Sequence, residues 1–215
     1  TRANAFDFDW KSYKPPRPKE LGVFTIEPGL DILSEYIDWT PFFMTWELAG
    51  RFPKILGDEV VGDAATQLFA DAKERLDWLI KDGRLKAAGV YGFWPANRCD
   101  SDDIQLFAEE SRGEVLAKLF HLRQQTPKPD DLAPNLCLAD FIAPEGIADY
   151  IGGFAVTAGL GVDEVLVEFE DDDYSQIMIK ALADRLAEAF AEYLHAEVRL
   201  KFWGHSSKEA LTLED

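Results

Sequence analysis

The sequence predicts a single α+β domain in which strands and helices follow one another irregularly. Apolar residues recur at helical spacing over residues 64–81 and 172–203, whereas 87–96 and 149–159 have the composition of strands. The order lacks the regular βαβ alternation of a doubly wound sheet, and it shows no internal repeat. With 215 residues, of which 47% are hydrophobic and 29% charged, the chain is long enough to bury a sizeable core.

The first 20 residues are expected to form an extended lead-in or linker, and residues 21–215 the domain itself. Residues 11–20, KSYKPPRPKE, are basic and rich in proline, which favours an extended chain. A strand is predicted from Val23 to Ile26, followed by a short helix over 31–37.

A second short helix is predicted to begin at Thr40 as its N-cap, with Pro41 at the first helical position and Gly50 at the stop. The next helix, over 64–81, is strongly amphipathic, and Gly83 is well placed to end it. Its apolar face consists of Leu68, Phe69, Ala72, Leu76, Leu79 and Ile80.

The second half of the chain is predicted to alternate more quickly between elements. After the strand at 87–96 comes an acidic turn, DSDD, and then a short strand in which Ile104 and Leu106 alternate with polar neighbours. Residues 113–125 are predicted to be helical, and TPKPDDLAP (126–134) to be a loop. The strand at 149–159 and the long helix from Asp172 to Trp203 complete the series.

Composition and charge exclude several classes of function. The formal net charge of −18 argues against nucleic acid or an anionic membrane as the main partner. No apolar run approaches the roughly 18 residues needed to cross a bilayer, and the N-terminus has no secretory signal. Cys99 and Cys137 show no metal spacing, so two thiols in a reducing cytoplasm are expected. Because the first residue is not methionine, the chain is expected to be a piece of something larger.

The motifs of common enzyme classes are missing, so no catalytic residue and no metal ligand is assigned. The sequence has neither a dinucleotide-binding G-x-G-x-x-G that opens a helix nor a phosphate loop. His121, His195 and His205 are far apart in sequence and lack the spacing of a zinc site. Neither cysteine has the local signature of a nucleophile.

One charge on the long helix departs from the helical pattern. At 100° per residue, Arg185 falls inside the apolar arc, between Ala181 and Ala189. A charge on the buried side of a helix needs partners, and Glu188 and Glu192 lie near the same edge. A simple helix salt bridge between Arg185 and Glu188 explains the pattern; a site for a charged ligand among the small alanines explains it as well.

Asp38 is the second candidate, because it is the one acid in the aromatic stretch YIDWTPFFMTW (36–46). Aromatic residues at this density are typical of a core, and Asp38 in that setting can be a helix cap or a turn residue. The alternative is a carboxylate that receives an ammonium group beside apolar walls.

Seven segments of the sequence resemble the S-adenosylmethionine-binding reactivation domain of cobalamin-dependent methionine synthase. They occur in the order and at about the spacing of that family, and together they span residues 5 to about 205. The segments are YIDWTPFFMTWELAG, GFWPANR, HLRQQT, LADFIAP, DYIGGFAVTAG, DDYSQIMIKALADRLAEAFAEYLH and FWG.

The resemblance implies a fold and a function. The fold is a twisted antiparallel sheet with flanking helices. The function is reductive reactivation of cobalamin during methionine biosynthesis: flavodoxin supplies an electron, S-adenosylmethionine supplies the methyl group, and a neighbouring domain holds the cobalamin. The whole enzyme is a methyltransferase acting on 5-methyltetrahydrofolate and homocysteine, and the isolated fragment is not expected to be active alone.

The resemblance also implies the ligand site. Arg185 and Glu188 match the D-R-L-A-E motif of the family, and Asp38 matches the acid of its I-D-W-T-P-F-F motif. Acids suit a sulfonium and an α-ammonium group, and an arginine suits the ligand carboxylate. We therefore expect Asp38, Arg185 and Glu188 to line one cleft.

The family pattern continues beyond Asp215 into a loop, R-P-A-P-G-Y-P, which contributes to ligand binding and is followed by further helices and strands. We therefore expect this chain to lack the last strands of the sheet and to bind S-adenosylmethionine more weakly than a longer chain.

Two further functions remain open from the sequence. The first is a non-catalytic docking module for flavodoxin or the cobalamin domain that no longer binds S-adenosylmethionine. The second is an unrelated acidic enzyme that uses a carboxylate pair such as Glu188 and Glu192. For docking of an acidic electron donor, the candidate cations are either Lys11, Lys14, Arg17 and Lys19 or Arg98 and Arg123.

Overall fold

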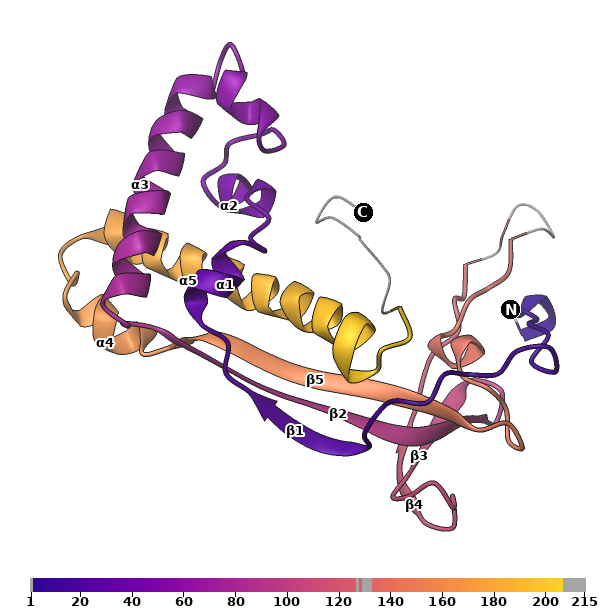
Figure 1. Cartoon of the computed structure of the whole chain (residues 1–215). Coiled ribbons are helices and arrows are strands. Elements are labelled where there is room, and N and C mark those ends of the chain that lie inside the picture. The colour runs from indigo at the N-terminus through magenta and orange to yellow at the C-terminus, as the bar shows by residue number, and fades with distance from the viewer. Residues whose placement is uncertain (1, 127, 129–132, 207–215) are drawn as a thin grey trace. The chain divides into compact units, whose positions relative to one another are not determined.

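The computed structural model of the chain describes residues 2–126, 128 and 133–206 (Figure 1). Contacts between residues divide the chain into two compact units. The sheet-rich unit comprises residues 1–24, 91–154 and 199–208, and the helical unit comprises 25–90, 155–198 and 209–215. The division into a lead-in over 1–20 and a domain over 21–215 stays a prediction.

The described elements mix strands and helices without a regular alternation, which confirms the predicted α+β class. None of the described helices combines the length and the apolar content that crossing a membrane requires. In chain order the elements are η1 (Arg2–Asn4), β1 (Gly22–Ile26), α1 (Leu30–Ser34), α2 (Thr40–Thr45), η2 (Lys54–Gly57), α3 (Gly62–Lys81), β2 (Lys86–Cys99), β3 (Asp103–Phe107), β4 (Val115–Leu119), η3 (Leu138–Phe141), β5 (Asp149–Leu160), α4 (Val162–Val167), α5 (Asp173–Glu197) and the π-helical turn η4 (Val198–Phe202).

The five strands form one sheet in the order β1-β2-β3-β4, with β5 also paired to β2. β2 pairs antiparallel with β3, with Ala96 opposite Leu106 and Arg98 opposite Ile104. β3 pairs antiparallel with β4, and the register shifts between Leu106 and Phe107. The antiparallel sheet with flanking helices is the architecture that the resemblance implied.

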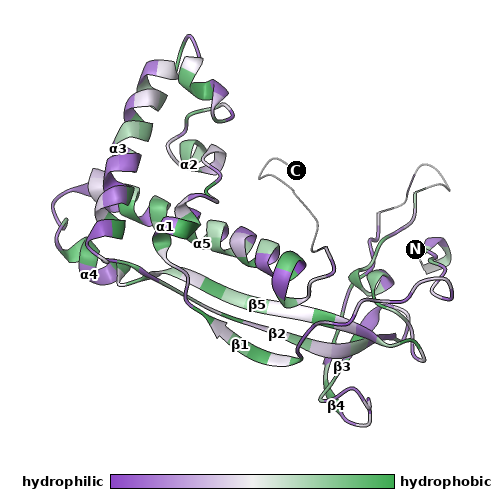
Figure 2. Ribbon diagram, viewed as in Figure 1, coloured by the Kyte–Doolittle hydropathy of each residue, from purple (hydrophilic) through white to green (hydrophobic). Residues whose placement is uncertain are grey.

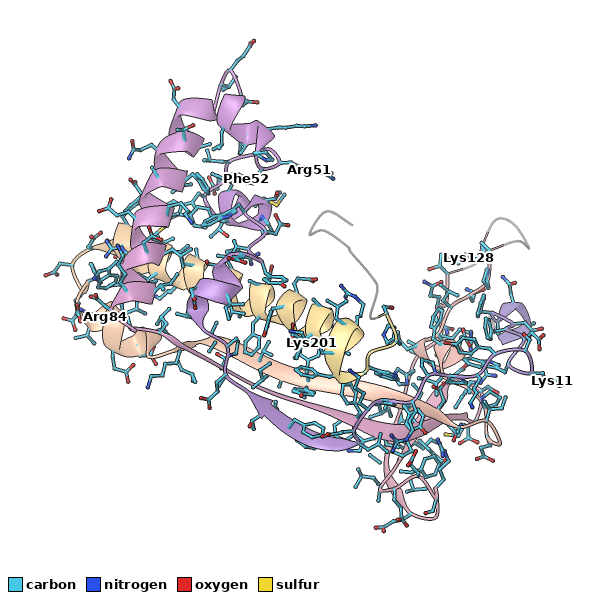
Figure 3. The ribbon with its side chains drawn as sticks, viewed as in Figure 1. Lys11, Arg51, Phe52, Arg84, Lys128 and Lys201 are labelled. Atoms are coloured by element: carbon cyan, nitrogen blue, oxygen red, sulfur yellow. The ribbon has the colours of Figure 1, made fainter. Side chains whose placement is uncertain are left out.

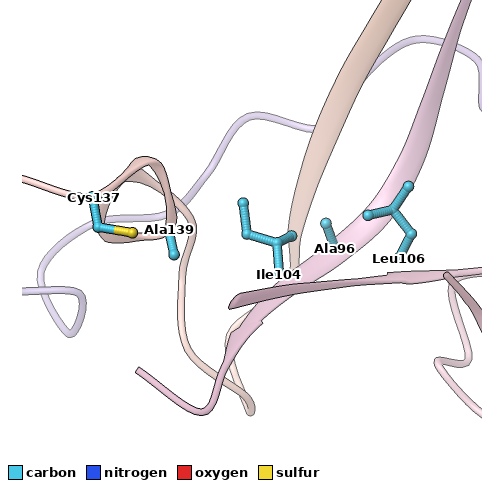
Figure 4. Close-up of a cluster of buried hydrophobic side chains, with 5 residues drawn as sticks. All are labelled: Ala96, Ile104, Leu106, Cys137 and Ala139. Atoms are coloured by element: carbon cyan, nitrogen blue, oxygen red, sulfur yellow. The ribbon is translucent and has the colours of Figure 1, made fainter. Parts of the chain in front are cut away.

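A small core joins the sheet to the loop that precedes β5 in the sheet-rich unit. Figure 4 shows this cluster, in which Ala96, Ile104 and Leu106 from β2 and β3 face Cys137 and Ala139 from the loop and η3. All five side chains are buried. Ile104 and Leu106 point to the same side of the sheet because they are alternate residues of β3. The cluster fixes the segment around η3 against the strands.

The helical unit is organised around α5, which contacts α1, α2, α3 and α4. Figure 2 shows hydrophobic and hydrophilic residues alternating along this helix, as expected for one buried stripe. Gly89 of β2 lies against this stripe: a Cβ added there would come within 2.8 Å of the Phe190 ring. The fully buried members of the stripe are Ile179, Leu182, Leu186, Phe190 and Leu194.

Most of the predicted elements are confirmed. The strand before residue 27, the amphipathic helix near 64–81, the strands at 87–96 and 149–159 and the short strand around Ile104 are all present. Gly83 follows the end of α3 with a φ of +60°, the left-handed conformation that a glycine stop requires. The predicted loop at 126–134 falls largely outside the described residues.

The predicted helix over 113–125 is wrong, because Val115–Leu119 forms strand β4. In this segment Leu116, Leu119 and Leu122 recur at a helical spacing, whereas Val115, Ala117 and Leu119 alternate as in a strand. Pairing with β3 decides between the two, since Leu119 lies opposite Ile104 and Ala117 opposite Leu106.

The boundaries of two helices also differ from their predictions. Trp39, not Thr40, is the N-cap of α2, because the Asp38 side chain already accepts a hydrogen bond from the Thr40 backbone N–H. α2 ends at Thr45, well before Gly50. α5 is regular only to Glu197, and the remaining predicted turns form η4.

Candidate functional site

Arg185 lies in the middle of α5, on the side of the helix that is packed against its neighbours. Its side chain is only 12% exposed, and Ala181 and Ala189, one turn away on either side, are both buried. Arg185 therefore lies inside the apolar arc of the helix, as the helical pattern predicted.

Glu188 is the partner of Arg185 in this chain. Arg185 Nη2 donates to Glu188 Oε1 at 2.7 Å, and Nη1 donates to Glu188 Oε2. The two groups therefore form the bidentate pair that the sequence offered as the simpler explanation. The Glu188 side chain is still 63% exposed, so its carboxylate retains lone pairs that face solvent.

Asp38 lies in the short connection between α1 and α2, and it is exposed. Its Oδ1 atom accepts a hydrogen bond from the Thr40 backbone N–H at 2.8 Å. The contact holds the first turn of α2, which is the turn role that the sequence left open for this residue. The second carboxylate oxygen remains available for another donor.

Two aromatic pairs fix the stretch that contains Asp38 along α5. The Tyr36 and Tyr193 rings meet edge to face at 5.5 Å, and the Trp46 and Tyr174 rings lie 5.0 Å apart. Residues 36–46 therefore run in the opposite direction to α5, and Arg185 and Glu188 lie between the two fixed positions.

The spacing along the two segments favours one shared site. Glu188 is five residues from Tyr193, about 7.5 Å along the helix axis. Asp38 is two residues from Tyr36, at most about 7 Å of chain. Two carboxylates and one guanidinium at this spacing suit a ligand that carries positive centres and a carboxylate. The common cleft itself stays a prediction.

Glu192 does not form a proton-sharing pair with Glu188 in this arrangement, because the Glu188 carboxylate is already paired with Arg185. The described residues also contain no group of three or more His, Cys, Asp or Glu that could hold a metal ion.

The sequence did not reveal a buried ionic network in the sheet-rich unit. Arg123 was a candidate docking cation, which requires an exposed side chain, and this expectation is wrong: Arg123 is 3% exposed. Its guanidinium donates to Asp140 at 2.6 Å and to Asp102 at 2.8 Å. Although burial opposes ionisation, the hydrogen bonds from Arg123 and from the Cys137 backbone N–H keep the pKa of Asp140 below its usual value.

A second buried network holds the loop before β5. The Asn97 amide donates to the carbonyls of Ala143, Pro144 and Ile147, and its oxygen accepts from Arg112 Nε at 2.9 Å. Asp149 accepts backbone hydrogen bonds, but burial raises the pKa of its carboxyl group. Asn97 could have been noticed in the sequence, because it is a polar residue inside the apolar strand pattern GFWPANR.

Comparison with known proteins gives a family and a solved relative. Residues 29–215 match the family described as the activation domain of vitamin B12-dependent methionine synthase. The chain is also similar to a crystal structure of the MetH reactivation domain bound to AdoHcy, with 53% sequence identity and a TM-score of 0.94. The alignment covers 99% of this chain and 66% of that one, so this chain spans slightly less than two thirds of its relative.

Proposed function

Because the chain belongs to the activation-domain family of vitamin B12-dependent methionine synthase, we propose that it binds S-adenosylmethionine for the reductive methylation of cobalamin. The observation that carries the proposal is the 53% identity, over 99% of the chain, to a reactivation domain crystallised with AdoHcy. AdoHcy is what remains of S-adenosylmethionine after its methyl group has left.

The three candidate residues fit this ligand by their chemistry. S-adenosylmethionine carries a sulfonium, an α-ammonium and a carboxylate. Asp38 and Glu188 are assigned to the positive centres and Arg185 to the carboxylate, through charge-assisted hydrogen bonds. The Arg185–Glu188 pair then holds both side chains in place before the ligand arrives, which lowers the entropy lost on binding.

The chain's own residues supply binding and orientation in this proposal, not acid–base catalysis. Cobalamin, held by a neighbouring domain of the enzyme, supplies the metal centre that accepts the methyl group. The site has to hold the sulfonium methyl toward that acceptor and to keep water away, so the rate depends on positioning.

The proposal extends to the whole enzyme and its partners. The enzyme is assigned as the methyltransferase that acts on 5-methyltetrahydrofolate and homocysteine in the cytoplasm, with flavodoxin or an equivalent protein as electron donor. Burial of Arg123 removes it as a docking residue, and Arg98 is only partly exposed. Lys11, Lys14, Arg17 and Lys19, all exposed, remain the candidates for steering an acidic donor.

Calorimetric titration of this chain with S-adenosylmethionine and with AdoHcy tests the proposal. We expect both to bind the wild type, and Asp38→Asn to bind about tenfold more weakly, since a charge-assisted hydrogen bond contributes roughly 1.5–3 kcal/mol. Glu168→Gln is the matched control, because Glu168 is the exposed partner of Arg84 in another ion pair of the helical unit. A wild type that binds neither ligand would instead support the docking-module alternative.

The two ligands differ by the methyl group and the positive charge on sulfur, and this difference locates Glu188. If the Glu188 carboxylate faces the sulfonium, Glu188→Gln weakens S-adenosylmethionine more than AdoHcy. If it faces the α-ammonium, both ligands weaken equally. Unchanged affinity for both would remove Glu188 from the site.

A further inference from the structure

A groove in the sheet-rich unit, away from the proposed ligand residues in sequence, lies beside the N-terminal segment, residues 5–19. Trp10, Tyr13 and Pro15 form one wall, and Ile147, Ala148 and Tyr150 form the other. The space between them is about 770 Å³, within the range of sites that hold a ligand or a peptide segment. Figure 3 labels Lys11 on this segment.

The groove is positively charged although the chain is strongly acidic. The chain has 40 acidic and 22 basic residues, yet the described residues that line the groove include three cations, Lys11, Lys14 and Arg17, and no carboxylate. Lys11 and Lys14 are exposed, and among the described residues no ion pair neutralises them. Arg17 is paired with Glu110 beside the groove, and Asp9 accepts from the Lys11 backbone N–H, so the positive charge that can attract an anion is that of the Lys11 and Lys14 side chains.

The N-terminal segment is fixed in place, so the groove is a formed feature. Arg17 donates to both carboxylate oxygens of Glu110, at 2.8 and 3.0 Å, and the Tyr150 hydroxyl donates to the same carboxylate at 2.8 Å. Trp203 Nε1 donates to the Pro16 carbonyl at 2.8 Å. Through Glu110, Arg17 is thereby anchored to the turn before β4 and to Tyr150 of β5, and Pro16 is anchored to Trp203.

Aromatic rings continue the apolar surface beyond the groove. Trp10 and Tyr13 pack against Phe8, with ring centroids 4.7 and 5.6 Å away, and Phe6 packs against Phe141 at 5.8 Å. Phe8 is 39% exposed and Phe141 56% exposed. Exposed aromatic residues are enriched where proteins meet other proteins.

We propose that this groove binds an acidic segment of a partner protein, with an apolar or aromatic side chain between its walls and carboxylates on Lys11 and Lys14. Lys11 and Lys14 are three residues apart, up to about 10 Å of chain, which suits successive acidic side chains better than one compact anion. Nucleic acids and anionic membranes are extended polyanions, which the net charge of −18 repels.

The acidic partner would be the electron donor of the proposed function, and this inference rests on that function only for the identity of the partner. Its test involves no S-adenosylmethionine and no cobalamin, so its failure and the failure of the proposed function are distinguishable.

Fluorescence anisotropy with a labelled peptide tests the proposal. The probe alternates Asp and Glu with Phe, and a second peptide of equal length has Ser in place of every acid. We expect the acidic peptide to bind, the Ser peptide to bind at least about fivefold more weakly, and salt to weaken the acidic complex.

Charge reversal locates the binding. Lys11→Glu/Lys14→Glu should weaken the acidic peptide at least about fivefold at low salt, since two attractive contacts become repulsive. Lys54→Glu/Lys73→Glu makes the same change in net charge at exposed positions of the helical unit and should leave binding unchanged. Loss in both variants, equal binding of the two peptides, or tighter binding of single-stranded DNA or phosphatidylserine vesicles would overturn the proposal.

Discussion

At the scale of single residues, Arg123 orders the loop between β4 and β5. Its guanidinium makes five hydrogen bonds, to Asp102, to Asp140 and to the Asn135 carbonyl, so every N–H group has an acceptor. The Asp140 side chain is fully buried and also accepts from the Cys137 backbone N–H. The network therefore joins the β2–β3 turn to the loop that carries η3.

We expect Arg123→Met to destabilise the chain by about 3–5 kcal/mol, because it leaves two buried carboxylates without their cation. Urea unfolding measures the change. Arg84→Met is the control, since the Arg84–Glu168 pair is partly exposed and should contribute no more than about 1 kcal/mol. Equal losses in the two variants would mean that the buried network contributes little.

Glu110 is the residue whose ionisation should appear in the pH dependence of stability. Hydrogen bonds from Arg17 and then from Tyr150 lower the pKa of its carboxyl group from 4.5 to about 2. A group whose pKa is lower in the folded state stabilises that state above its unfolded pKa, and this contribution disappears as pH falls through the folded pKa.

The free energy of unfolding should therefore fall from about pH 4.5 toward pH 2, and it should fall less steeply in Glu110→Gln. Chemical unfolding at a series of pH values gives both slopes. Glu109→Gln, at an exposed neighbouring position, should keep the wild-type slope. A Glu110→Gln slope equal to that of the wild type would show that the Arg17 contact does not persist in solution.

The two arginines show how far residue-level prediction from sequence extends. The position of Arg185 inside an apolar arc follows from the helical period, and its pairing with Glu188 follows from a spacing of three residues. Arg123 has partners 21 residues before it and 17 residues after it. No local pattern contains such partners, so its burial could not be predicted without the fold.

At the scale of elements, long regular patterns were predicted correctly, whereas the ambiguous pattern over 113–125 was not. α3 and α5 have enough turns for their apolar period to be unambiguous, and β2 and β5 are bounded by turns. β4 has only five residues, in which Leu116 and Leu119 have helical spacing while Val115, Ala117 and Leu119 alternate, so its pairing with β3 decides its conformation. The N-cap of α2 is Trp39 and not the predicted Thr40, because the Asp38 carboxylate accepts the hydrogen bond of the Thr40 backbone N–H.

Substitution of Gly89 tests how closely β2 packs against α5 in the helical unit. A Cβ at this position would lie 2.8 Å from the Phe190 ring and 3.0 Å from a methyl group of Val156, which is closer than carbon atoms normally approach. We expect Gly89→Ala to cost about 1–3 kcal/mol in the free energy of unfolding.

Thermal and urea unfolding measure this cost. Gly57→Ala is the matched control, because nothing lies within 4 Å of the added Cβ there. If Gly89→Ala were as stable as that control, the close contact between β2 and the Phe190 ring would not exist in solution.

At the scale of the whole molecule, the acidic net charge limits the kinds of partner but does not identify the function. The net charge of −18 repels extended polyanions, but the exposed side chains of Lys11 and Lys14 can still attract an anion locally. Long segment resemblances across the chain predicted the family, which the match over residues 29–215 confirms. The individual ligand contacts depend on side-chain positions that the resemblance could only suggest.

The most direct test of the proposed function follows the methyl group in the complete enzyme that contains this domain. After oxidation of the cobalamin, S-adenosylmethionine with a labelled methyl group and a reducing partner are added, and the label on cobalamin is measured. We predict that the label appears with the wild type, and that Asp38→Asn needs about tenfold more S-adenosylmethionine for the same rate while Glu168→Gln behaves as the wild type. Unlabelled cobalamin in the wild type, or an unaltered requirement in Asp38→Asn, would contradict the account.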